Sequence, residues 1–517
     1  MAMIARSHVC FVGYALIAIA LVGCGGQGQP RSRASSPSQA SANSPAPAED
    51  EPLAPLQYEA ALPAVVREVL AKRFTGDLDQ MIERRVIRAG VTYNRTHYFV
   101  DKGVQRGASY EYLKLFEDRI NAVLKTGALR IHVVYIPMPR GMMLTALNEG
   151  RIDLAEGQFT ITPELQALVD FGVPQRRDVK QIVVTAPGAP PVNVVEDLSN
   201  RQVFVRKSSS YYQSLLALNT RLESIGRPPV VITEMPESLE DDDLLEMVNA
   251  GLIQTIVVDD YLALFWKRVL PGLKVHADVT LRNGGELAVA FRKNSPLLAK
   301  AVADFTRRWG LGTAFGNMIR KRYLESTKFV KNATAPAERQ KFDSMVALFR
   351  KYGAQYDLDY LLMGAQAYQE SRLDHNARSR VGAIGVMQIM PATAAELGVG
   401  DIRGLEPNIH GGTKYIRWLI NTYLEDEPMD QVNKMLFAFA SYNAGPGRIR
   451  QLRRESARRG RDPNVWFGNV EQTASEHIGR ETVDYVSNIF KYYIAYSLGV
   501  QELERREAAR ERVKSQR

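Results

Sequence analysis

Hydrophobic and polar residues follow two main patterns along the folded part of this 517-residue chain. Residues 62–85 carry apolar side chains at helical spacing. From residue 86, short apolar runs such as 86–93, 131–136 and 255–258 alternate with amphipathic segments such as 110–124. Alternation of this kind favours an α/β architecture with a mixed sheet. We therefore predict strands and helices in turn up to about residue 330.

Beyond residue 335 the pattern becomes helical throughout. Five segments place apolar residues three and four positions apart, at 342–352, 358–369, 411–425, 432–440 and 483–498. An all-α domain of about 165 residues is long enough to bury a core and fold alone. We place this second domain at 335–500.

The N-terminal segment has a different composition. Residues 1–8 contain one arginine and no acidic side chain, and 9–22 form an apolar run too short to span a membrane comfortably. These features are typical of a secretory signal. Residues 25–55 are rich in Ser, Pro, Ala, Gly and Gln, and such a segment cannot bury enough surface to fold. We interpret 24–60 as a tether.

The apolar run ends in the tetrapeptide LVGC at Cys24, which resembles the bacterial lipobox. The resemblance implies a signal peptide at 1–23, lipidation of Cys24 and stable anchoring by several acyl chains. The next residue, Gly25, implies the periplasmic face of the outer membrane under the Gram-negative sorting rule. An ordinary cleaved signal or an uncleaved anchor is the alternative. Either alternative also places the body of the protein outside the cytoplasm.

Composition narrows the classes of function. Hydrophobic residues make up 45% and charged residues 24% of the chain, which is a globular balance. The net charge of +9 is modest, and without an RNA- or DNA-binding module we expect no nucleic-acid partner. Both cysteines, Cys10 and Cys24, lie near the N-terminus, so the body has no disulfides. The seven histidines lack metal-ligand spacing, so we expect neither a metal nor another cofactor.

The stretch DLAEGQFTITPELQALVDFG at 153–172 resembles family 3 periplasmic solute-binding domains. The resemblance covers about 78–327 and implies two α/β lobes that close over a ligand, with lobe 2 at about 191–283. We place this domain at 61–330. Amino-acid binders of the family read TITPER, and the arginine clamps the α-carboxylate of the ligand. This chain has Leu165 there, which argues against free amino acids.

Two residues remain candidates for a regulatory ligand. Asp259, in QTIVVDDYLALF, matches the aspartate that accepts the ligand amine in this family, and Thr160 opens the TITPEL motif. A muropeptide or another amine-bearing cell-wall ligand is our hypothesis. A degenerate module that serves only as a spacer is the alternative.

Four stretches of the helical region resemble the lysozyme-like domain of soluble-type lytic transglycosylases, and they occur in the family's order across about 341–498. They are AYQESRLDHNARS around Glu370, GAIGVMQIMPATAAELGV from Gly382, ASYNAGPGRI from Ala440 and ETVDYVSNIFKYY from Glu481. The predicted fold class is therefore multidomain, with a two-lobed α/β solute-binding-like domain followed by an all-α lysozyme-like domain. Four motifs in order outweigh any one of them alone.

Glu370 is the predicted catalytic residue. Glycosidic cleavage needs a carboxylic acid that stays protonated near neutral pH and delivers its proton to the leaving oxygen. Glu370 follows apolar positions of a helix, where desolvation raises the pKa of a carboxyl group. A buried structural glutamate is the alternative for this residue taken alone.

The resemblance assigns six further residues to binding and orientation of a glycan. Two are expected to contact the N-acetyl group, two to line the cleft where rings stack on sugars, and two to orient the carboxyl group. Met387 and Gln388 are the expected contacts of the N-acetyl group. Tyr442 and Asn443 are expected to line the cleft, and Tyr485 and Ser371 to orient the carboxyl group. For residues 385–388 the structural alternative is a loop that only covers the core. For Tyr485 it is an ordinary core tyrosine.

The resemblance implies a peptidoglycan lytic transglycosylase, a carbon–oxygen lyase that needs no second carboxylate. The 6-hydroxyl of N-acetylmuramic acid attacks its own anomeric carbon, so positioning replaces activation of water. A muramidase that uses water and a glycan-binding sensor or scaffold are the alternatives.

Seven arginines at 448–461 suggest a solvated loop, or a surface that attracts stem peptides. The charged tail 501–517 suggests an exposed helix or a frayed end without a role.

Overall fold

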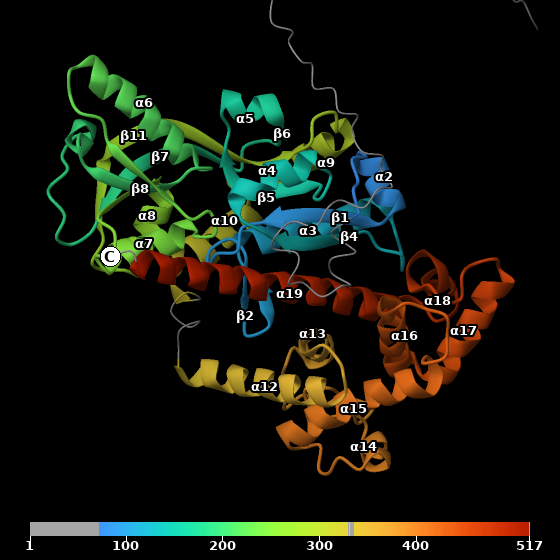
Figure 1. The fold of residues 1–517 in the computed structure, drawn as a ribbon. Helices are drawn as coiled ribbons and strands as arrows, with labels where there is room; N and C mark the ends of the chain where they lie inside the picture. The colour runs from blue at the N-terminus through green and yellow to red at the C-terminus, as the bar shows by residue number, and fades with distance from the viewer. Residues whose placement is uncertain (1–71, 329, 331–335, 516–517) are drawn as a thin grey trace, which may run out of the picture. The chain divides into compact units, whose positions relative to one another are not determined.

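Strands and helices alternate in the first half of the described chain, and helices alone form the second half (Figure 1). The computed structural model describes residues 72–328, 330 and 336–515. The predicted signal peptide, Cys24 and the predicted tether lie outside these residues. Within the described part, no helix combines the length and apolar character that a membrane crossing requires. The predicted order, an α/β region followed by an all-α region, is confirmed.

One sheet organises the α/β region. Its strand order in the described chain is β4-β1-β5-β11-β7-β10-β8-β9, and β6 pairs with β11 beside this path. All six residues of β4 are buried, as expected for a strand covered on both faces. The strands of the sheet are β1 (Val86–Val91), β4 (His132–Pro137), β5 (Leu154–Thr160), β6 (Asp170–Phe171), β7 (Arg176–Thr185), β8 (Gln202–Arg206), β9 (Val231–Met235), β10 (Thr255–Asp259) and β11 (Lys274–Phe291). A separate hairpin joins β2 (Phe99–Asp101) and β3 (Val104–Arg106).

Two lobes share the long antiparallel strands β7 and β11. In the first lobe β1 runs parallel to β4 and β5, and β5 pairs with the end of β11. In the second lobe β8 runs parallel to β9 and β10, and β10 pairs with β7. Each lobe has a buried cluster of its own, which contains Tyr98 and Phe305 in the first and Leu215 and Trp266 in the second. The α-helices are α2 (Leu78–Glu83), α3 (Ala108–Leu124), α4 (Arg140–Asn148), α5 (Pro163–Leu168), α6 (Ser210–Ser224), α7 (Asp241–Asn249), α8 (Asp260–Lys267), α9 (Pro296–Trp309) and α10 (Ala314–Arg320).

The second half packs its helices around a core that includes Phe437, Trp466 and Ile489. Phe437 and Ile489 come from segments with helical spacing, and Trp466 begins a short irregular helical element at Trp466–Val470. Its helices are α12 (Pro336–Gln355), α13 (Tyr360–Ser371), α14 (Pro391–Leu397), α15 (Leu405–Tyr423), α16 (Gln431–Ala444), α17 (Pro446–Arg458), α18 (Glu471–His477) and α19 (Arg480–Ser515).

The arginine run at 448–461 is largely helical, so the prediction of a solvated loop is wrong. Most of the run belongs to α17, and part of it makes internal contacts. Arg453 is buried and donates to Glu427 at 3.0 Å, and Arg461 donates to Glu476 at 3.0 Å. These partners lie in other segments, so the run's spacing alone did not reveal them.

Of the predicted tail 501–517, the described residues 501–515 are not the exposed or frayed end that their charge suggested. Residues up to Ser515 continue α19, and the buried guanidinium group of Arg506 lies 2.9 Å from Asp242 and 2.8 Å from Asp243 of α7. Nearer the start of α19, the Lys491 ammonium lies 2.5 Å from Glu117 of α3. One helix therefore binds to both lobes through buried ion pairs.

Removal of the Arg506 charge should destabilise the whole chain. In Arg506→Met the carboxylates of Asp242 and Asp243 stay buried beside a neutral side chain, and we expect the free energy of unfolding to fall by about 3–5 kcal/mol. Chemical denaturation followed by circular dichroism measures this change. Lys514→Met removes an exposed ion pair with Glu511 and should change the free energy by less than about 0.5 kcal/mol. Equal stability of the two variants would contradict the proposed contribution of Arg506.

Candidate functional site

Helix α13 places Glu370 at its C-terminal end. The helix begins where Asp359 Oδ1 accepts a hydrogen bond from the backbone N–H of Leu361 at 2.8 Å. It ends at Ser371, and the next residue, Arg372, has a left-handed backbone with φ of 59°. The apolar face between these ends is buried in the domain core. Glu370 therefore lies on a rigid element, one residue before the helix ends.

The carboxyl group of Glu370 is largely desolvated and has one strong polar contact. The hydroxyl of Tyr485 in α19 donates a hydrogen bond to Glu370 Oε1 at 2.5 Å. Burial raises the pKa of Glu370 to about 7, although the hydrogen bond from Tyr485 acts to lower it. The side chain is partly buried and not sealed off from solvent. Glu370 can therefore hold a proton near neutral pH and still meet a ligand at the surface.

Three helices meet at this carboxyl group. Tyr485 is buried on α19. Burial raises the pKa of Tyr442 of α16, and the charge of nearby Glu370 adds to this shift. The hydroxyl of Tyr442 donates to the backbone carbonyl of Met387 at 2.7 Å. Asn443 Oδ1 accepts a hydrogen bond from Thr482 of α19 at 2.7 Å. The first, third and fourth motifs are thus adjacent in space.

The second motif forms a loop held in a fixed conformation. Gly385 and Gln388 both have positive φ, at 79° and 45°, and a Cβ at Gly385 would lie 2.5 Å from the side chain of Asn408. Gln388 Nε2 donates to the carbonyls of Ala377 and Gly385 at 3.2 and 2.8 Å. The amide of Gln388 therefore supports the loop itself.

Asn408 holds this loop and was not identified in the sequence. Its side chain accepts from the backbone N–H of Met387 at 2.9 Å and donates to the carbonyls of Ile384 and Ile402 at 2.8 and 3.0 Å. Asn408 is fully buried on α15. The one sequence feature that could have indicated this role is a polar amide at a position of the helix where an apolar residue is expected.

The structure corrects the predicted roles of Met387 and Ser371. Met387 is fully buried, and its side chain packs against Gly412 of α15. It therefore fills the core and does not face an N-acetyl group. The hydroxyl of Ser371 donates to the carbonyls of Val386 and Ala367 at 2.9 and 3.3 Å, so it fastens the end of α13 to the loop and does not orient the carboxyl group of Glu370.

Asp259 and Thr160 lie in the α/β region, apart from one another in sequence and on different lobes. Asp259 is buried, and no described residue makes a hydrogen bond to its Oδ1. Burial, followed by the charge of nearby Asp241, raises the pKa of Asp259 to about 7. Thr160 of β5 lies 3.1 Å from the hydroxyl of Ser210 in α6. This contact joins the first lobe to the second.

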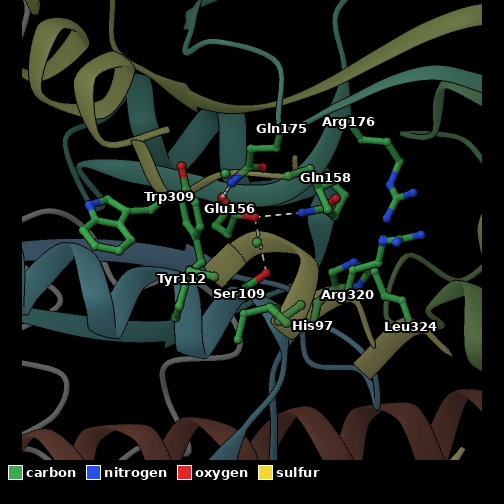
Figure 2. A pocket seen from close by; sticks show the side chains of 16 residues that line it. His97, Ser109, Tyr112, Glu156, Gln158, Gln175, Arg176, Trp309, Arg320 and Leu324 are labelled. Carbon is green, nitrogen blue, oxygen red and sulfur yellow. Dashed lines mark hydrogen bonds between the residues drawn. The ribbon is translucent and has the colours of Figure 1, made fainter. Parts of the chain in front are cut away.

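A further acidic residue lines a pocket that Figure 2 shows from close by. Glu156 of β5 is 1% exposed and accepts hydrogen bonds from Gln158 at 2.7 Å, Gln175 at 3.2 Å and Ser109 at 3.3 Å. Burial raises the pKa of Glu156 to about 7. The pocket holds about 70 Å³, and Tyr112 and Trp309 contribute to its wall. In the sequence, the sign of this residue is a single acidic side chain within the strand Leu154–Thr160.

No group of three or more His, Cys, Asp or Glu side chains among the described residues is arranged to hold a metal ion.

Comparison with known proteins supports the two-part organisation. The family model "Bacterial extracellular solute-binding proteins, family 3" matches residues 87–309, and "Transglycosylase SLT domain" matches residues 347–465. Proteins named "Membrane-bound lytic murein transglycosylase F" from Shewanella woodyi and Aeromonas salmonicida are each 27% identical to this chain. Those alignments cover 80% and 81% of this chain and 85% and 84% of the relatives. The chain is a homologue of these transglycosylases.

The predicted combination of a family 3 solute-binding module and a lytic transglycosylase domain, in that order, is therefore confirmed. Among solved structures, an ancestral arginine-binding protein bound to arginine is 22% identical, with a TM-score of 0.38. The alignment covers 46% of this chain and 98% of the arginine-binding protein.

Neutralisation of Glu370 should change the pH dependence of stability. The pKa of Glu370 is about 7 in the folded protein against 4.5 in the unfolded chain, so the folded state holds a proton that the unfolded state releases between these values. Stability must then fall as pH rises from about 4.5 to 7. Glu370→Gln removes this loss and should stabilise the protein at pH 8 by at most about 3 kcal/mol.

Thermal unfolding across pH 4 to 8 measures the difference between Glu370→Gln and the wild type. The two proteins should unfold alike below about pH 4.5, where the carboxyl group is protonated in both states. Glu396→Gln changes an exposed glutamate of the same domain and is the matched control. A parallel pH dependence of wild type and Glu370→Gln would show that the carboxyl group is not desolvated.

Proposed function

We propose that this protein is a lytic transglycosylase of peptidoglycan, with Glu370 as its catalytic acid and base. The bond cleaved is the β-1,4 linkage between N-acetylmuramic acid and N-acetylglucosamine, and the product carries a 1,6-anhydromuramic acid end. The observation that carries the proposal is the largely buried carboxyl group of Glu370, which accepts a hydrogen bond from Tyr485 and stays protonated near neutral pH. The relatives and the matched SLT domain support the same reaction class.

The reaction needs one carboxyl group, which acts twice. Protonated Glu370 first gives its proton to the glycosidic oxygen, which leaves as the 4-hydroxyl of N-acetylglucosamine. The 6-hydroxyl of the muramic acid then forms a bond to the anomeric carbon, and its proton passes to the Glu370 carboxylate. The carboxyl group is thereby restored, and no water is consumed. The internal nucleophile is already close to its target, so the enzyme has only to fix the geometry of the sugar.

The surrounding residues supply that geometry. Tyr442 and Asn443 stand at the end of α16 beside Glu370, and Gln388 belongs to the loop fixed by Asn408. We assign the side chains of Tyr442, Asn443 and Gln388 to the wall on which a glycan strand lies. Asp374 and Glu396 are both exposed, and Asp374 Oδ1 accepts from the backbone of Asn376 at 2.9 Å. The proposed mechanism uses neither carboxylate.

We also propose that the chain is anchored at the periplasmic face of the outer membrane through lipidated Cys24. The LVGC tetrapeptide after an apolar run supports a lipid anchor, and Gly25 supports the outer membrane. The relatives carry the words "membrane-bound" in their names, which agrees with an attachment of some kind.

Product analysis tests the reaction directly. Wild-type protein incubated with purified peptidoglycan should release muropeptides that are lighter by one water than hydrolysed ones, as mass spectrometry will show. Glu370→Gln should lower the rate by at least about 10³-fold, since an amide cannot donate the proton. The alkaline limb of kcat/KM should fall near pH 7, where the acid loses its proton. Products of ordinary mass would identify a muramidase, and binding without cleavage would identify a sensor or scaffold.

The solute-binding module is proposed to bind an amine-bearing cell-wall ligand, with muropeptides as the first candidates. The buried, unpartnered Oδ1 of Asp259 supports an ammonium group as the missing partner. Calorimetric titration of full-length protein with purified muropeptides should detect binding that tightens as pH rises through about 7, because Asp259 then becomes charged. Asp259→Asn should weaken it by about tenfold or more.

Asp278→Asn changes an exposed aspartate of β11 and should leave this affinity unchanged. If the calorimetric titration shows no binding heat at millimolar muropeptide, the hypothesis of a muropeptide ligand is wrong. The module would then be interpreted as a spacer.

A further inference from the structure

Gln366 lies one helical turn before Glu370 on the same face of α13. Its relative exposure is 0%, so its side chain cannot touch a glycan strand. Gln366 Nε2 donates a hydrogen bond to the hydroxyl oxygen of Tyr485 at 3.3 Å, and that hydroxyl donates to Glu370 Oε1 at 2.5 Å. An amide, a phenol and a carboxyl group thus form a short chain of hydrogen bonds.

The direction of this chain follows from the donors available. A phenol hydroxyl has one proton, and the amino group of a glutamine side chain only donates. Once Tyr485 accepts from Gln366, its proton has to point away from the amide and toward Glu370. A phenol that accepts one hydrogen bond also becomes a stronger donor in the next. Gln366 therefore fixes Tyr485 as the donor and Glu370 Oε1 as the acceptor.

We propose that Gln366 is a positioning residue which, through Tyr485, keeps the acidic proton of Glu370 on Oε2. Oε1 is then the carbonyl oxygen of the neutral acid, and Oε2 is the atom that delivers its proton to the leaving oxygen. Without this constraint the tyrosine hydroxyl can rotate, and the carboxyl proton can sit on either oxygen. The inference rests on the proposed function, because the orientation matters only if Glu370 transfers a proton.

Stability does not account for a glutamine at this position. Gln366 Oε1 is buried and accepts no hydrogen bond from any described residue. A buried carbonyl group without a partner lowers the free energy of unfolding, whereas an apolar side chain of similar size does not. The helix would therefore fold at least as well with leucine, and the amide is better explained by what its nitrogen does to Tyr485.

Gln366→Leu in the full-length protein tests the proposal. We expect kcat on peptidoglycan to fall about three- to tenfold, the range that one ordinary hydrogen bond supports, with little change in KM. The midpoint of thermal unfolding should stay the same or rise. In a Tyr485→Phe background the same substitution should have no further effect on kcat, because the hydroxyl it orients is gone.

Gln105→Leu is the matched control, because Gln105 is also buried and is paired with the hydroxyl of Tyr98 at 2.9 Å, away from Glu370. It should leave kcat unchanged. The proposal is overturned if Gln366→Leu leaves kcat unchanged, or if it lowers the unfolding midpoint and reduces kcat equally with and without the Tyr485 hydroxyl.

A second measurement separates this proposal from the proposed function. The pKa of Glu370 can be followed by NMR of ¹³C-labelled glutamate carboxyl groups, with Glu370→Gln to assign the signal. Gln366→Leu should move that pKa upward, because a less constrained Tyr485 stabilises the carboxylate less, and Tyr485→Phe should move it further. If wild type releases no anhydro product, the proposed function fails, and this titration alone decides whether Gln366 acts on the carboxyl group. An unchanged pKa would overturn that role.

Discussion

The desolvated carboxyl group of Glu370 is the feature on which the catalytic region depends. Burial raises its pKa to about 7, and a single hydrogen bond from Tyr485 opposes that effect. A nearby cation would have stabilised the carboxylate and removed the proton that the proposed reaction requires. The helices α13, α16 and α19 meet around the group and remove most of its contact with water, although the side chain is only partly buried. Burial of this carboxyl group therefore lowers the free energy of unfolding at neutral pH.

The helix that supplies Tyr485 also docks on the solute-binding module. Near its start α19 contributes Tyr485, which donates a hydrogen bond to the carboxyl group of Glu370, and toward its end Arg506 and Arg510 pair with acidic side chains of α7. Lys491 lies between these points and pairs with Glu117 of the first lobe. Because a helix is stiff over this length, the contacts in the module help to fix the position of the tyrosine.

The sequence predicted the parts of the site that local motifs carry, which include Glu370, Tyr485 and the alternation of the α/β region. It failed where burial depends on residues far along the chain. The resemblance of its motif assigns Met387 to an N-acetyl group, but Gly412 of α15 leaves room for its side chain in the core. The many charges of the tail predict an exposed segment. Arg506 is nevertheless buried, because it pairs with Asp242, which lies 264 residues earlier in the chain. Pairing over such distances leaves no periodic signal in a single sequence.

The long strand β11 has a mechanical consequence for the two lobes. Its ladder with β7 shifts register at four places between His276 and Leu287, and each shift removes regular hydrogen bonds and bends the strand locally. A ribbon interrupted in this way flexes at its irregular points more easily than a straight ladder does. Translation of one lobe past the other, by contrast, would require every remaining rung to break together. The connection between the lobes thus favours rotation and resists shear.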